Sequence, residues 1–307
     1  MKTEIYKTLS DDFPVGKFIR VGENRNVSTY VGRDSEGRYS FDFRGRFKLA
    51  RTKSSEVICV AHVQSQDDMI LRFSLENSSL LEYFCAFCAD LVDSVLAIND
   101  DETAYSALRM RYFSWKQLFK PNHGNLTEIE IMGLIGELLF LRDYLIPKKG
   151  DADALESWMG PEKTHKDFSF NNEWFEIKAV SAGKDTVLIS SIEQLDSRDS
   201  GFLVIYSLEK MGPAYDGLKL NTLVNEMIPM FRFSQSKELF LAKLALYGFD
   251  FSQENDNFVY DVKSVSKYKV GGPDFPRITR DLLPQAISNA KYDIVITLLE
   301  PFKVISD

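Results

Sequence analysis

The sequence predicts an α/β protein of the α+β kind, with a β-rich N-terminal part and a second part built from helices and another sheet. Its 307 residues are 44% hydrophobic and 27% charged, which is an ordinary globular composition. Short alternating apolar segments fill the first eighty residues and predict strands. An apolar helix and a hairpin follow between residues 127 and 180, and they predict the second sheet.

Charge and hydropathy exclude some classes of protein. The net charge of -8 argues against coating nucleic acid by bulk charge, although local basic patches can still bind it. The N-terminal residues 1–12 are polar and of mixed charge, which indicates no signal peptide. The most apolar long segment, residues 80–98, carries three acids and predicts a buried helix rather than a membrane span. We therefore expect a soluble, cytoplasmic protein with no membrane partner.

The N-terminal part reads as an antiparallel sheet followed by two helices. Its predicted strands are residues 17–21, 27–31, 39–43, 57–63 and 69–75, separated by turn residues. Asn77 is a candidate cap for a helix that runs to about residue 98, and a second helix is expected over residues 103–119. Turn residues at 121–125 predict a boundary between domains at 1–122 and 123–307.

One basic segment stands out in the N-terminal part. Residues 44–53 carry five cations and no acid, with Phe47 among them. Such a patch can contact phosphates, and Arg44 and Arg46 are the candidates that we single out. A sheet edge protected by positive charge would have the same composition, so both interpretations stay open.

The helix predicted over residues 127–145 begins with a capping box, in which Thr127 is followed by Glu130. From Ile131 to Leu141 it is apolar on nearly all sides, which predicts burial. Glu137 lies in the middle of this run. Because a buried carboxylate without a partner is costly, Glu137 should meet a cation or face a polar cleft.

A hairpin is predicted around Asn171-Asn172, because asparagine tolerates the backbone of tight turns. A two-residue turn places Asp167 opposite Glu176, with Lys178 on the same face of its strand. Two facing carboxylates repel, so a stable sheet would not favour them unless a divalent cation bound between them. The alternative is an ordinary solvated strand face.

The remaining chain is predicted to continue with helices and strands. The expected elements are strands at 186–190, 202–208, 258–270 and 292–299, and helices at 191–197, 218–231 and 236–247. Between residues 263 and 280 there are five cations and one acid, so Lys267, Lys269, Arg277 and Arg280 are candidates for contact with a nucleic-acid backbone.

This order of elements, with a glutamate on the helix, an aspartate on one strand and Glu-x-Lys on the next, resembles the PD-(D/E)XK nuclease superfamily. The resemblance implies a restriction-endonuclease-like αβββαβ core with a mixed sheet. The segments 133–141, 158–161, 166–170 and 275–279 are more narrowly similar to a bacterial family of PD-(D/E)XK proteins encoded near restriction and phage-defence genes. Lys166 departs from the motif, which has a proline at this position.

The resemblance assigns roles to individual residues. Asp167 and Glu176, with the carbonyl of Ile177, would bind Mg²⁺ or Mn²⁺, and Glu137 would hold the metal's waters or a second ion. Lys178 would activate the attacking water and stabilise the charged transition state. Weaker candidates for orienting Lys178 or touching the substrate are Gln194 and Ser190.

The resemblance therefore implies a magnesium-dependent endonuclease that hydrolyses DNA in a restriction or phage-defence system. The alternative is a catalytically silent subunit of such a system that binds DNA or supports assembly, which the acidic net charge favours. The expected partners are DNA, other subunits of the system and a second copy of the chain, since cutting both strands often uses two copies.

Overall fold

The computed structural model describes residues 1–10, 12–64, 68–119, 126–197 and 199–304. The chain forms two compact units, each described by itself below. The first comprises Met1–Gly124 and Phe233–Gln253, and the second comprises Asn125–Arg232 and Glu254–Asp307. The domain boundary predicted at residues 122/123 lies outside the described residues, so it stays a prediction.

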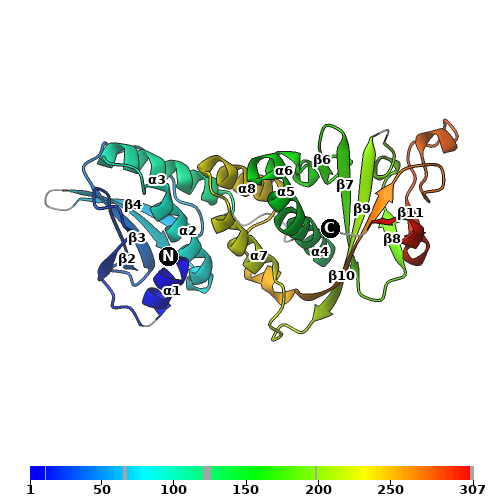
Figure 1. Cartoon of the computed structure of the whole chain (residues 1–307). Helices are drawn as coiled ribbons and strands as arrows, with labels where there is room; N and C mark the ends of the chain where they lie inside the picture. Colours follow the sequence, from blue (N-terminus) through cyan, green and yellow to red (C-terminus); the bar gives the residue numbers. More distant parts are fainter. Residues whose placement is uncertain (11, 65–67, 120–125, 198, 305–307) are drawn as a thin grey trace. The chain divides into compact units, whose positions relative to one another are not determined.

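The first unit contains the predicted antiparallel sheet, with strand order β1-β2-β3-β5-β4. All five predicted strands are confirmed: β1 (Phe18–Val21), β2 (Ser28–Arg33), β3 (Tyr39–Gly45), β4 (Ile58–Gln64) and β5 (Met69–Leu75). Helices α2 (Leu81–Ser94) and α3 (Asp101–Lys116) pack on one face, where Phe73 of β5 contacts Phe87 and Tyr112 (Figure 1). Helix α1 (Lys2–Ser10) was not predicted, and it buries Ile5 and Leu9.

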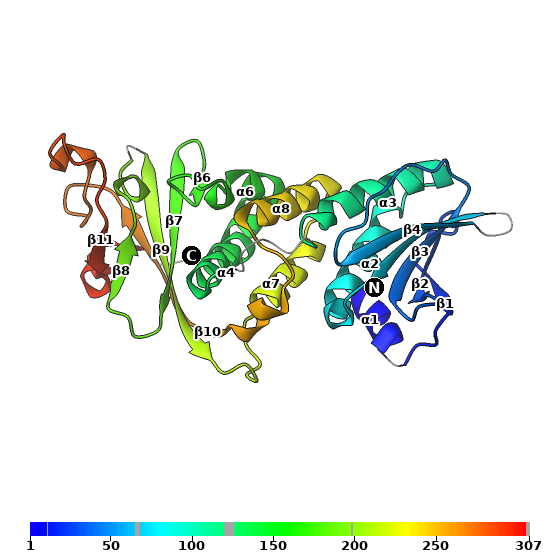
Figure 2. The same ribbon diagram turned by 180° about the vertical axis from the view of Figure 1, so that it is seen from behind.

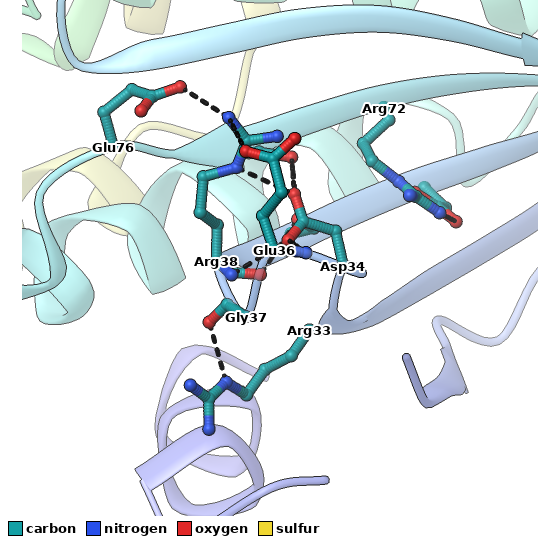
Figure 3. Close-up of polar contacts among 10 residues, drawn as sticks. Arg33, Asp34, Glu36, Gly37, Arg38, Arg72 and Glu76 are labelled. Carbon is teal, nitrogen blue, oxygen red and sulfur yellow. Dashed lines mark hydrogen bonds and ion pairs between the residues drawn. The ribbon is translucent and has the colours of Figure 1, made fainter. Parts of the chain in front are cut away.

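A buried charged turn closes the β2–β3 hairpin (Figure 3). Asp34 is 2% exposed, and its carboxylate accepts hydrogen bonds from the Arg38 guanidinium at 2.9 Å and from the Ser74 hydroxyl at 3.0 Å. Burial alone would raise the pKa of Asp34, but these bonds outweigh it and hold the pKa below its ordinary value. Arg38 also pairs with Glu76 at 2.9 Å. All these charges have partners, so the turn is structural.

Helix α8 (Ser234–Tyr247) belongs to the first unit although more than one hundred residues separate it from α3. Buried Asp90 of α2 ties the three helices together. Its carboxylate accepts from the Trp115 indole at 2.8 Å and pairs with Arg111 at 3.3 Å and with Lys237 at 3.1 Å. A buried carboxylate needs such partners.

The second unit is built on a mixed five-stranded sheet of order β12-β10-β9-β7-β6, here called the main sheet. Its strands are β6 (Phe168–Ser169), β7 (Glu173–Ser181), β9 (Ser200–Met211), β10 (Val259–Val270) and β12 (Lys303–Val304). β7 and β9 run parallel, and the other neighbours run antiparallel. The predicted α+β class with a mixed sheet is confirmed.

Two layers cover the main sheet (Figures 1 and 2). On one face lies α4 (Glu128–Phe140), where Gly136 packs on Ile177 and Ala179. On the other face, β8 (Thr186–Ile189) and β11 (Tyr292–Val295) form a separate two-stranded sheet. This small sheet shares an apolar core with Trp174 and Leu203 of the main sheet.

Helix α4 has the capping box that the sequence predicts, with reciprocal bonds between Thr127 and Glu130. The predicted helix over 127–145 is not uniform, because a π-helical turn occupies Leu141–Leu145. Short helices α5 (Ile146–Lys149) and α6 (Asp151–Ser157) follow. Helix α7 (Leu220–Met227) is shorter than the helix predicted over 218–231 and ends just before Pro229, because proline lacks the N–H that a helix interior needs.

Two more predicted elements are wrong in length. The helix expected at 191–197 is a single 3₁₀ turn, Ile192–Gln194, and carbonyls at its end accept side-chain bonds. Lys166 binds the carbonyls of Glu193 and Gln194, and Arg277 binds that of Leu195. The strand expected at 292–299 ends at Val295 and becomes a 3₁₀ segment, Ile296–Phe302.

In the described part of the chain, no helix combines the length and apolar character needed to cross a membrane.

Candidate active site

The β6–β7 hairpin has the predicted register. Phe168 pairs with Phe175, and Ser169 pairs with Trp174. Continuing this register by one residue places Asp167 against Glu176. The Asp167 carboxylate is fixed there, because its Oδ2 accepts a hydrogen bond of 2.7 Å from the backbone N–H of Ile177.

Glu176 is the most constrained acid of the group. It is 1% exposed, and neither of its buried oxygens has a hydrogen-bond partner among the described residues. Lys178 Nζ lies 2.8 Å from Oε1 and forms an ion pair with it. Burial, reinforced by the charge of Asp167, raises the pKa of Glu176 to about 8.

Asp167 and Lys178 complete a buried charged cluster around Glu176. Burial raises the pKa of Asp167, although the charge of Lys178 opposes the shift. Burial also disfavours the charged form of Lys178, but the two carboxylates outweigh it and raise the lysine's pKa. Two buried carboxylates thus share the Lys178 ammonium group, and the charge of Lys166 also acts on both.

Gln194 holds Lys178 in place. Lys178 Nζ donates to Gln194 Oε1 at 3.0 Å, and the same oxygen accepts the backbone N–H of Ser190 at 2.7 Å. Ser190 therefore contributes through its backbone in this arrangement. Both weaker candidates adjoin the lysine, and a substrate contact by either stays a prediction.

Lys166 fixes the turn that carries Gln194, a role that the sequence did not reveal. Its Nζ donates to the carbonyls of Glu193 and Gln194, both at 2.6 Å, and lies 3.7 Å from the Trp174 ring centroid. Burial lowers the pKa of Lys166 to about 8, although the charge of Glu176 partly opposes the shift. The only signal in the sequence was a lysine at the position of the motif's proline.

Glu137 is buried, as predicted, and is 6% exposed. Its Oε2 accepts a hydrogen bond of 2.7 Å from the Trp158 indole. Gly160 packs so closely on the same oxygen that a Cβ atom there would overlap it. The N–H groups of Met159 and Gly160 donate to the carbonyl of Asp167 at 2.7 and 3.1 Å. One turn therefore touches both Glu137 and Asp167, and the charge of Glu137 contributes to the raised pKa of Lys178.

Arg277 and Arg280 lie beside the Gln194 turn and fasten loops. Arg277 Nη1 donates to the carbonyl of Leu195 at 2.7 Å. Arg280 Nη1 donates to the carbonyls of Ile287 and Ser288 at 2.6 and 3.1 Å. Contact between these arginines and a substrate stays a prediction.

Lys267 and Lys269 point to the face of the main sheet opposite Glu176. Their partners across β9 are Val204 and Phe202, which share a face with Ile177 and Phe175 rather than with Glu176 and Lys178. The structure therefore does not bring these two lysines into the charged cluster.

Arg44 and Arg46 belong to the first unit. Arg44 lies over the Tyr30 ring, 4.2 Å from its centroid, and bonds Asp42 at 3.2 Å. The side chain of Arg46 is 81% exposed, with Asp68 at 3.8 Å. A substrate role for either residue stays a prediction.

The donors of the charged cluster fit a hard divalent cation. No group of three or more His, Cys, Asp or Glu side chains in the described ranges is arranged to hold a metal ion. The candidate metal ligands are fewer: the Asp167 and Glu176 carboxylates and the Ile177 carbonyl. This carbonyl points to the same edge of its strand as the Ile177 N–H, which binds Asp167. The unbonded oxygens of Glu176 are the group most in need of a cation. Mg²⁺ prefers such oxygen ligands and completes its shell with water.

A comparison with protein families matches residues 3–297 to the DUF4420 family, described as "Putative PD-(D/E)XK family member". The match covers nearly the whole chain and includes every residue of the charged cluster. No curated protein and no solved structure matches the chain.

Proposed function

Because the chain belongs to this PD-(D/E)XK family, whose membership suggests a nuclease-type function, we propose that it is a magnesium-dependent endonuclease that hydrolyses DNA phosphodiester bonds. The observation that carries the proposal is the buried cluster of Asp167, Glu176 and Lys178. Its lysine Nζ lies 2.8 Å from a carboxylate whose oxygens have no hydrogen-bond donor among the described residues. Such a cluster is costly in a fold without a function for it.

Each residue of the cluster has a distinct task in this proposal. Asp167 and Glu176, with the Ile177 carbonyl, hold the cation, and the Ile177 N–H fixes the orientation of Asp167. Lys178 orients the attacking water and stabilises the negative charge that develops on the phosphate. Gln194 keeps the lysine amine directed into the cluster. Glu137, bound to the Trp158 indole, orders water at the cluster's edge.

A divalent cation held by these residues would lower the pKa of a coordinated water and would polarise the phosphodiester. Mn²⁺ has the same preference for oxygen ligands and should replace Mg²⁺.

The proposed setting is a restriction or phage-defence system in the cytoplasm, with further subunits and a second copy of the chain as partners. This setting rests on the family resemblance alone. The acidic net charge of -8 favours the second candidate, a silent DNA-binding or assembly subunit.

The test is cleavage of plasmid DNA with Mg²⁺ or Mn²⁺ by the parent protein, Asp167→Ala and Lys178→Ala. Removing one group that stabilises charge in a transition state costs roughly 100-fold or more. Lys184→Ala is the matched control, because Lys184 is an exposed lysine in the turn after β7. It should cut like the parent.

Equal cutting by the parent and both cluster variants would contradict the assignment of catalysis to these residues. If none of the proteins cuts, the silent-subunit candidate is favoured. The two candidates then differ in Mg²⁺ binding, which calorimetry with the parent and Asp167→Ala measures directly.

A further inference from the structure

The face of the main sheet opposite Glu176 carries a pocket of about 340 Å³ between α4, the π-helical turn and strands β9 and β10. The π-helical turn brings Arg142 and Tyr144 to its rim, and such turns are frequent at functional sites. Its wall on β10 is apolar and open to solvent, with Val262 38% and Val265 49% exposed. The proposed chemistry does not use this pocket.

Lysines stand over the aromatic rings around the pocket. Lys148 Nζ and Lys267 Nζ lie 4.3 and 4.7 Å from the centroid of the Tyr144 ring. Lys267 Nζ is also 5.1 Å from the Phe202 ring, and it donates to the Tyr144 hydroxyl at 2.9 Å. Phe140 also stacks on the Tyr144 ring, with 4.9 Å between the centroids, so an incoming flat group would pack on this ring by displacing one of the two lysine amines.

The same arrangement continues along the sheet. Lys149 Nζ lies 5.2 Å from the Phe170 ring, and Lys269 is exposed two residues beyond Lys267 on the same face of β10. Phe175 connects the rings, since it contacts Tyr144, Phe170 and Phe202. The aromatic–lysine patch, as we call it, consists of Lys148, Lys149, Lys267, Lys269, Tyr144, Phe170 and Phe202.

The lysines of the patch carry uncompensated charge. None of the four forms an ion pair with a carboxylate of the described residues, whereas Arg142 on the rim pairs with Asp143 at 2.6 Å. In a chain of net charge -8, four such lysines on one face are a local exception. Their ligand must supply negative charge at several points, and the rings and the pocket suit a flat apolar group.

We propose that the aromatic–lysine patch binds single-stranded DNA, with a base in the pocket against Tyr144 and successive phosphates on the lysines. Stacked bases and a basic track for the backbone are the shared elements of single-strand binding sites. A duplex would offer the lysines its phosphates but keep its bases stacked inside, so the pocket favours an unpaired strand. An acidic peptide would use the lysines without needing the flat ring surface.

The inference rests on the proposed function only in taking DNA as the polyanion. The patch and the charged cluster lie on opposite faces of the main sheet, so binding and cleavage can be measured separately.

The test is binding of a fluorescent oligothymidylate and of a duplex of the same length, in EDTA, over a range of KCl concentrations. The parent should bind the single strand more tightly than the duplex. Because each phosphate contact to a single strand contributes about 0.7 to the slope of log K against log salt, Lys148→Gln with Lys149→Gln should reduce the slope by about 1.4. Tyr144→Leu should weaken binding roughly tenfold, the typical effect of one lost stacking partner.

Controls separate binding from folding. Tyr144→Phe keeps the ring and should bind nearly like the parent, and Lys184→Gln should change neither affinity nor slope. Thermal unfolding shows whether Tyr144→Leu is folded. The Lys148→Gln and Lys149→Gln substitutions lie at exposed positions. They therefore test the proposal even if the Tyr144→Leu variant does not fold.

Two results would overturn the inference. One is absence of single-strand binding by the parent. The other is that the parent binds single strand, duplex and heparin equally well and that Tyr144→Leu does not change this binding. Such a result would show that the patch binds any polyanion. Loss of binding in the patch variants would support the inference even if the parent cuts no DNA, because the assay contains no metal.

Discussion

Replacing Glu176 with glutamine should make the metal-free protein more resistant to rising pH. Glu176 is 1% exposed, lacks hydrogen-bond donors among the described residues and lies near Asp167, so its charged form is disfavoured. Burial and this neighbour raise its pKa from 4.5 to about 8. A glutamine of nearly the same size cannot ionise, so the variant never has to bury the second negative charge.

The sign and size of the effect follow from proton linkage. An acid whose pKa is higher in the folded chain contributes stability that is present below the unfolded pKa and is lost as pH rises through the folded pKa. For Glu176 this interval extends from 4.5 to about 8. Within it the parent should lose ~1.4 kcal/mol of unfolding free energy per pH unit relative to Glu176→Gln. Between about pH 5.5 and about pH 7.5 the difference in unfolding free energy between Glu176→Gln and the parent should therefore change by about 3 kcal/mol.

The assay is hydrogen exchange of β7 and β9 peptides in EDTA, because local exchange reports the stability of the second unit alone. The parent and the variant are compared at each pH, which cancels the intrinsic pH dependence of exchange. Any packing cost of the glutamine is the same at every pH. The measured quantity is therefore the slope, against pH, of the difference in unfolding free energy between the parent and the variant. Glu173→Gln, at the half-buried start of the same strand, is the control and should run parallel to the parent.

Parallel stability curves for the parent and Glu176→Gln would refute the reasoning, since they would show that Glu176 binds no extra proton in the folded chain. Added Mg²⁺ provides a second arm. A cation held by the cluster stabilises the folded state by mass action and favours ionised carboxylates. It should flatten the pH dependence of the parent and leave Glu176→Gln nearly unchanged.

Two further predictions concern residues that support the cluster. Lys166→Met should reduce cleavage by about 10- to 100-fold, as supporting partners of metal sites do, and its effect should not add to that of Gln194→Ala. The double-mutant cycle is measured as cleavage rates at saturating DNA. Additive losses would show that Lys166 acts independently of Gln194 and would contradict its assigned role. Gly160→Ala should cost about 1–3 kcal/mol in chemical unfolding, because its Cβ would overlap the Glu137 carboxylate. Adding Glu137→Ala should recover part of this loss, and a Gly160→Ala variant as stable as the parent would exclude the overlap.

The hairpin was predictable because local rules determine it. The spacing of residues around Asn171-Asn172 fixes which side chains face each other, and the apolar residues Phe168 and Phe175 select the buried face. Asp167 and Glu176 then meet without any information from distant parts of the chain. The capping box of α4 was predictable for the same reason.

Contacts that depend on the tertiary structure were not predictable. Ile5 and Leu9 of α1 are buried, and the helix α2 against which α1 packs lies far along the chain. The turn at Ile192–Gln194 has a helix-like pattern in the sequence, and its contacts with Lys166 and Arg277 come from distant parts of the chain. The bond between Trp158 and Glu137 likewise joins residues that no local pattern connects.

Lys166 links the fold to the proposed chemistry. A proline at its position would restrict the backbone before Asp167 but could not reach the turn that carries Gln194. The lysine extends to that turn and binds two carbonyls at 2.6 Å each. The shortened turn leaves the Gln194 side chain free to accept from both Lys178 and the Ser190 N–H. The lysine that departs from the motif therefore positions the amide behind Lys178.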